Sequence, residues 1–215
     1  MGIYIEALIL YIILFFSGSA APYFNGGGQE SFPALPELVK IILYILPSLA
    51  LIWYCMLRVK SLKKWGVIPG IKDLVSGLIA LPCLLITGFV ISSVSSFLGE
   101  TSPVQIQSPS SAVEWIILCV SCISAAYLEE SFFRFYLLAR RREMKLTASA
   151  ALVVSVALFS ICHIYEGPWG FLNSLVSGAI LSFIFLRYEA LHGIAAAHGL
   201  YNIAIYVINA VTTQN

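Results

Sequence analysis

The sequence predicts an all-α fold: a polytopic transmembrane helical bundle of about seven spans, within a range of six to eight. Hydrophobic residues make up 60% of the chain and charged residues only 11%, whereas a soluble domain typically has about 25% charged residues. The mean hydropathy is +0.91, and apolar segments of roughly 20 residues, the length that crosses a bilayer, follow one another along the chain. The net charge of +1 gives no reason to expect a nucleic-acid partner.

The spans are separated by short loops rich in Gly, Pro and Ser. The first span is followed by small residues that resemble a signal-peptide cleavage site, but no Lys or Arg precedes it, so we expect it to remain as a helix. The predicted spans are residues 3–20, 36–57, 72–98, 112–139, 147–165, 168–188 and 190–211. We expect one integral membrane domain over residues 1–215, in which residues 1–111 supply N-terminal helices and residues 112–211 supply the helices that carry polar motifs.

The placement of Lys and Arg predicts the orientation of these spans. Nine of the twelve cations lie in or beside two loops, the one after the second span and the one after the fourth. The positive-inside rule makes both loops cytoplasmic, which puts the N-terminus inside and the C-terminus outside. Binding of these loops to anionic lipids is compatible with the same orientation. The compact loops favour a prokaryotic cytoplasmic membrane.

Three charged residues stand inside the fourth predicted span: Glu129, Glu130 and Arg134. A charge at the bilayer centre costs at least about 2.5 kcal/mol, so such groups usually pair or face a water-filled cavity. Glu130 and Arg134 are four residues apart and can form an ion pair along one helix face. Glu129 points about 100° away from Glu130 around the helix, so we expect it to face another helix.

Later spans carry the remaining polar residues at helical spacing. His198 and Asn202 are four residues apart, as are Phe159 and His163. A single histidine would more often be a packed core residue, but together with Glu129 these side chains favour a functional site. Counting about 1.5 Å per residue places His163 at a different depth from the other groups, so we expect a tilted or shifted helix to bring them together in one cavity.

Three segments, "EESFFR", "FSICH" and "HGLYN", resemble in order the Glu-Glu-x-x-x-Arg, Phe-x-x-x-His and His-x-x-x-Asn motifs of the CAAX-protease and bacteriocin-processing family. Members of this family are glutamate-type intramembrane endopeptidases, related to the type II CAAX prenyl endopeptidase. The resemblance spans residues 129–202. One departure is Phe135, which follows Arg134 where the family commonly has glycine.

The resemblance implies a peptide hydrolase and a role for each motif residue. Glu129 would be the general base, which with His163 would hold and deprotonate a water molecule, while His198 and Asn202 would donate hydrogen bonds to the oxyanion. Glu130 and Arg134 would be structural or supporting residues, and Phe159 would pack beside the site. No cofactor is needed for this chemistry. The substrate would be a membrane-associated protein or peptide, such as a prenylated C-terminal peptide, a bacteriocin leader or the anchor of a surface protein.

Alternatives remain open. In a zinc-dependent version of the same protease, Glu129, His163 and His198 would be metal ligands with water in the fourth position. A membrane immunity or binding protein could keep the fold without turnover. A transporter or proton relay could use the same carboxylates, although no repeated halves or broken-helix pairs are visible. We also expect Glu166 to lie in an exposed turn, and Glu6 has no assigned role.

Overall fold

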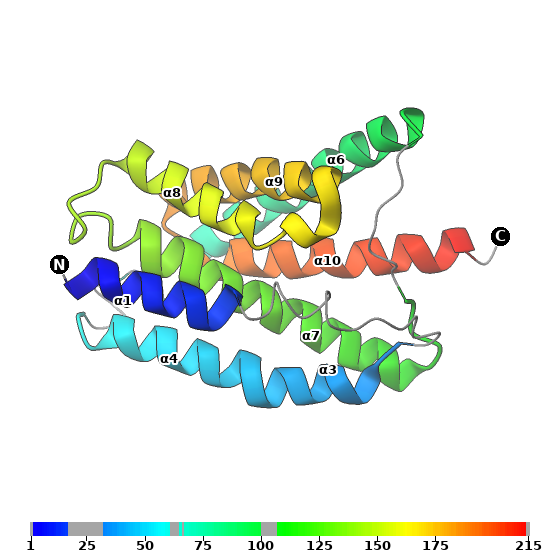
Figure 1. The fold of residues 1–215 in the computed structure, drawn as a ribbon, viewed down its shortest axis with the longest axis horizontal. Helices are drawn as coiled ribbons and strands as arrows, with labels where there is room; N and C mark the ends of the chain where they lie inside the picture. Colours follow the sequence, from blue (N-terminus) through cyan, green and yellow to red (C-terminus); the bar gives the residue numbers. More distant parts are fainter. Residues whose placement is uncertain (1, 17–31, 61–64, 66, 100–106, 214–215) are drawn as a thin grey trace.

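The computed structural model describes residues 2–16, 32–60, 65, 67–99 and 107–213. The described part of the chain folds into seven apolar helices arranged as one bundle (Figure 1). Five of them are long and apolar enough to cross a membrane, by length and composition: Ala34–Leu57, Ile71–Phe97, Ala112–Leu138, Ile164–Tyr188 and Leu191–Thr212. Two more, Gly2–Phe15 and Ala148–Ile161, are shorter. The predicted polytopic helical bundle is confirmed.

Several of these helices combine α-helical and wider, π-helical turns. The helical segments in chain order are α1 (Gly2–Tyr11), η1 (Ile12–Phe16), α3 (Ala34–Lys40), η2 (Ile41–Ile45), α4 (Leu46–Leu57), α6 (Ile71–Phe97), α7 (Ala112–Glu130), η3 (Ser131–Leu138), α8 (Ala148–Ile161), η4 (Ile164–Glu166), α9 (Gly167–Tyr188) and α10 (Leu191–Thr213).

The fifth predicted span, residues 147–165, is shorter than expected. Thr147 caps the start of α8, because its side chain accepts a hydrogen bond from the Ala150 N–H at 3.1 Å. The helix ends at Ile161, and after the short η4 turn Gly167 adopts a φ of +81°, a conformation that glycine permits at little cost. Pro168 then opens α9, where its missing N–H is not needed. The first predicted span reaches Phe16, and its last residues, 17–20, lie outside the described residues.

The start of α10 is joined to the start of α6. The Asp73 carboxylate accepts hydrogen bonds from the backbone N–H groups of His192 (2.8 Å) and Gly193 (3.1 Å). The free N–H groups at a helix start need such partners, so Asp73 caps a helix other than its own. A side chain at Gly193 would meet the backbone carbonyl of Asp73 and the hydroxyl of Ser76. The two helices therefore cross in direct backbone contact.

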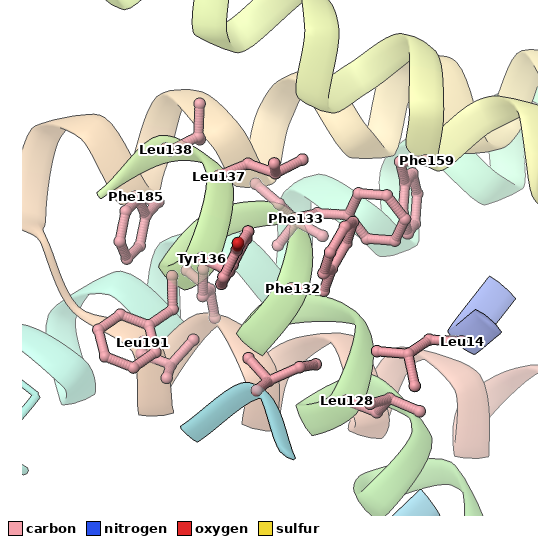
Figure 2. Close-up of a cluster of buried hydrophobic side chains, with 14 of the residues drawn as sticks. Leu14, Leu128, Phe132, Phe133, Tyr136, Leu137, Leu138, Phe159, Phe185 and Leu191 are labelled. Carbon is pink, nitrogen blue, oxygen red and sulfur yellow. The ribbon is translucent and has the colours of Figure 1, made fainter. Parts of the chain in front are cut away.

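The core surrounds η3, whose residues, Ser131–Leu138, are all buried. Figure 2 shows the aromatic and leucine side chains that pack around this segment. The rings of Phe132 and Phe133 lie 5.1 Å apart between their centroids, and Phe133 meets Phe159 of α8 edge-on at 5.2 Å. Aromatic rings prefer such edge-to-face arrangements, so these contacts stabilise the packing. The helix that carries the glutamate motif is thus held by packing on all sides.

An ionic network ties the two basic loops to α1 and gives Glu6 a structural role. One Glu6 carboxylate oxygen accepts hydrogen bonds from Tyr136 (2.5 Å) and Arg140 (2.8 Å). Arg58 lies 3.3 Å from the other oxygen, and Lys60 lies 3.1 Å from Glu143. Both basic loops therefore lie at the same end of the bundle. This arrangement is the one that the positive-inside rule requires, although the orientation of the termini stays a prediction.

Candidate active site

A cavity of about 470 Å³ opens at the end of the bundle away from the basic loops. Its lining residues on α7 precede η3, those on α9 lie in the first three turns, and those on α10 begin at His198. The polar and charged residues that line it are Glu37, Lys40, Ser121, Glu129, His163, Tyr165, Glu166, Asn173, Ser174, Ser177, His198, Tyr201, Asn202 and Tyr206. The cavity therefore gathers Glu129 of α7, His163 of the turn after α8, and His198 and Asn202 of α10.

Glu130 and Arg134 form the predicted ion pair beneath this cavity. Arg134 Nε lies 3.1 Å from Glu130 Oε2, and both side chains are fully buried. The guanidinium also donates from Nη2 to the carbonyl of Gly178 at 3.2 Å and lies 4.6 Å above the ring of Phe159. A buried ion pair needs such additional partners, because the attraction of the two charges alone does not offset their desolvation. The pair connects α7 and η3 to α8 and α9.

His198 lies between the two neighbouring glutamates, a contact that sequence reasoning missed. Its Nδ1 is 3.0 Å from Glu130 Oε1, and its Nε2 is 3.7 Å from Glu129 Oε2. The carboxylates differ in access, because the Glu129 side chain is 23% exposed and Glu130 is fully buried. Of the two, Glu129 is the one that lines the cavity. Glu129 is therefore the carboxylate that a molecule in the cavity can reach.

His163 enters the cavity from the end of α8, where the helix turns toward η4. Its Nδ1 is hydrogen-bonded to the carbonyl of Phe159 at 2.8 Å, which fixes the direction of the ring. The Phe159 ring lies between the two histidines, 4.6 Å from the ring of His163 and 6.0 Å from that of His198. His163 and His198 therefore line the same cavity, as expected, and the rings of both pack against the ring of Phe159.

Several lining residues lie outside the three motifs. Glu166, expected in an exposed turn, lines the cavity instead, because the short α8 turns back before reaching the end of the bundle. Glu37 and Lys40 of α3 form an ion pair at 2.7 Å, and Glu37 accepts a hydrogen bond from Ser121 of α7. No local pattern links α3 to the motifs, so only the packing of the bundle reveals this contribution.

No group of three or more His, Cys, Asp and Glu side chains among the described residues is arranged to hold a metal ion. Glu129 Oε2 lies 3.7 Å from His198 Nε2, but the Nδ1 of His198 is hydrogen-bonded to Glu130. The ring of His163 packs against Phe159. The alternative ligand set of Glu129, His163 and His198 therefore does not form a ready metal site in this arrangement.

Fold and site together define a class: an integral membrane protein with a buried carboxylate–histidine cluster that faces a cavity inside the bundle. Residues 111–204 match the model of the family described as type II CAAX prenyl endopeptidase Rce1-like. This match contains all three motifs and confirms the resemblance that they predicted. Searches of curated proteins and of solved structures found no significant match. The match covers 94 of the 215 residues and relates this part of the chain to a family of membrane proteases.

Proposed function

We propose that the protein is an endopeptidase that hydrolyses a peptide bond of a membrane-associated protein or peptide with a water molecule activated by Glu129. The observation that carries this proposal is the unequal surroundings of the two glutamates. Glu130 is fully buried against Arg134 and His198, whereas the Glu129 side chain is 23% exposed and lines the cavity. A general base must reach the proton that it removes, and of these two glutamates it is Glu129 that lines the cavity.

The proposed reaction balances with one water and no cofactor. Glu129 takes a proton from the water, whose oxygen attacks the scissile carbonyl carbon and forms a tetrahedral oxyanion. The carbon–nitrogen bond then breaks, and the proton on Glu129 passes to the leaving amine. His163, whose ring is fixed by the Phe159 carbonyl, would hold the water from the opposite side of the cavity through Nε2. Two groups on different helices would thus orient one water.

His198 and Asn202 would supply the oxyanion hole. With Nδ1 directed at Glu130, His198 can donate from Nε2 only as an imidazolium ion. That form also balances the cluster, because two carboxylates then face one guanidinium and one imidazolium. Loss of one oxyanion donor typically costs about 3–4 kcal/mol in the barrier.

The test uses purified protein in lipid nanodiscs and a library of quenched-fluorescent decapeptides, with mass spectrometry of the products. We expect cleavage by the native chain and none by Glu129→Gln, which keeps the shape of the side chain but removes the base. His163→Ala and His198→Ala should also lose activity. Double substitutions should be no worse than the single ones, because residues that act as one catalytic unit are not additive.

Three outcomes decide among the alternatives. Full cleavage by Glu129→Gln would exclude the glutamate-base mechanism. Loss of activity on chelation, restored by zinc, would recast the same residues as metal ligands, whereas we expect activity to survive chelation. A native chain that binds library peptides but never cleaves them would favour the immunity or binding protein.

A further inference from the structure

One wall of the cavity comes from α9, which carries none of the three motifs. Gly170, Asn173, Ser174 and Ser177 line the cavity from this helix. Their spacing of three, four and seven residues places them on a single helical face. We call these four residues the α9 wall. All four are small or polar, although α9 crosses the apolar part of the bundle.

The hydrogen bonds of the α9 wall are complete except at one residue. Ser174 donates to the Phe171 carbonyl of its own helix at 2.8 Å, and Asn173 donates to the hydroxyl of Tyr201 on α10 at 3.1 Å. Ser177 is only 6% exposed, and its Oγ has no hydrogen-bond partner among the described residues. A buried hydroxyl without a hydrogen-bond partner is unfavourable. A molecule bound in the cavity could supply the hydrogen bond that the Ser177 hydroxyl lacks.

The residue after Ser177 holds this part of the wall against the catalytic cluster. The Gly178 carbonyl accepts a hydrogen bond from Arg134, and a side chain at Gly178 would come within 2.9 Å of the Phe159 ring. Arg134 in turn contacts Glu130, which contacts His198. The packing therefore sets the position of Ser177 relative to the glutamates on α7.

We propose that the α9 wall binds the main chain of an extended substrate peptide, with the Ser177 hydroxyl hydrogen-bonded to one of its amide groups. This inference rests on the proposed function and names how the substrate is held. A peptide segment opened for cleavage inside a bundle has lost its helical hydrogen bonds, and in apolar surroundings its amides need new partners. A hydroxyl can donate and accept, and the small side chain of Ser174 lets a backbone approach closely.

The test compares two serine-to-alanine substitutions on one helix. Ser177→Ala removes the unpartnered hydroxyl of the α9 wall. Ser182→Ala is the matched control, because it removes a fully buried, unpartnered hydroxyl that does not line the cavity. With the decapeptide that the native chain cleaves fastest, we expect kcat/KM to fall about three- to tenfold for Ser177→Ala, the loss of one neutral hydrogen bond. The Ser182→Ala protein should match the native chain.

Ester analogues of the same decapeptide locate the bond. Each analogue replaces one amide by an ester, which removes an N–H donor and weakens the carbonyl acceptor. At one position the native chain should lose activity while Ser177→Ala loses no more. Equal kcat/KM for Ser177→Ala and the native chain, an equal loss in Ser182→Ala, or no ester position coupled to Ser177 would overturn the inference.

A binding measurement separates this inference from the proposed function. The Glu129→Gln protein, with and without Ser177→Ala, is incubated with the decapeptide library, and the retained peptides are counted by mass spectrometry. We expect Ser177→Ala to reduce retention about three- to tenfold. Equal retention would overturn the inference whether or not the native chain cleaves, whereas reduced retention without cleavage by the native chain would leave only the proposed function refuted.

Discussion

Two adjacent glutamates in one helix have opposite surroundings in this protein. Glu130 contacts Arg134 and His198 and is sealed from the cavity, whereas Glu129 reaches into it. Their difference follows from helix geometry, because consecutive side chains point about 100° apart around the axis. Identical side chains thus meet a buried cation on one side and open space on the other.

These surroundings predict that the two glutamates differ in their effect on stability. Glu130→Gln leaves Arg134 and His198 without their counter-charge, and breaking a buried pair typically costs about 3–5 kcal/mol. We expect a lower unfolding temperature and less folded protein in membranes, measured by thermal unfolding and fluorescence-detected gel filtration. Glu129→Gln is the matched control and should unfold like the native chain. Native stability of Glu130→Gln would mean that the pair is not structural.

At the scale of elements, the position of α10 depends on its contact with α6. Helix α10 carries His198 and Asn202, and Asp73 of α6 holds its first N–H groups. A Cβ at Gly77 would lie 3.0 Å from the carbonyl of Gly193, so both helices use glycine where they cross. Small residues at such crossings allow close packing in membrane proteins. A helix outside the family match therefore sets the depth of two proposed catalytic groups.

Gly193→Ala tests this crossing. The added methyl group would meet the Asp73 carbonyl, which is backbone and cannot turn aside, so we expect a loss near the upper end of the overpacking range, about 3 kcal/mol. Thermal unfolding in detergent measures the effect. Gly2→Ala is the control, because no atom lies within 4 Å of the added methyl group. Unchanged unfolding of Gly193→Ala would show that the helices can separate without cost.

At the scale of the whole molecule, the charge network and the cavity lie at opposite ends of the bundle. Arg58, Lys60 and Arg140 pair with Glu6 and Glu143 at one end, and the cavity opens toward the other. If the basic end is cytoplasmic, a substrate would reach the cavity from the outer half of the membrane. This orientation remains a prediction of the positive-inside rule.

Fusions to the full chain test the orientation. A reporter active only in the cytoplasm should give signal when fused to the N-terminus and none when fused to the C-terminus, because seven spans put the two ends on opposite sides. A reporter active only outside the cytoplasm should give the reverse pattern. Cytoplasmic signal from both ends would contradict the seven-span topology and require an even number of crossings.

The amino-acid sequence alone predicted the polytopic helical bundle, the seven apolar helices seen in the described part of the chain, and the Glu130–Arg134 pair. These features are local: apolar length predicts a span, and a spacing of four residues predicts a contact within one helix. The three motifs also predicted which residues share a cavity.

How these groups meet depends on the packing of helices that are distant in the sequence. His198 contacts Glu130, which is 68 residues away in the chain. The cavity lining also brings Lys40, Glu166 and Ser177 together with the motif residues. Such contacts depend on where each helix ends and how deeply it crosses its neighbours. Those features follow from side-chain packing between helices, which apolar periodicity along a single helix does not encode.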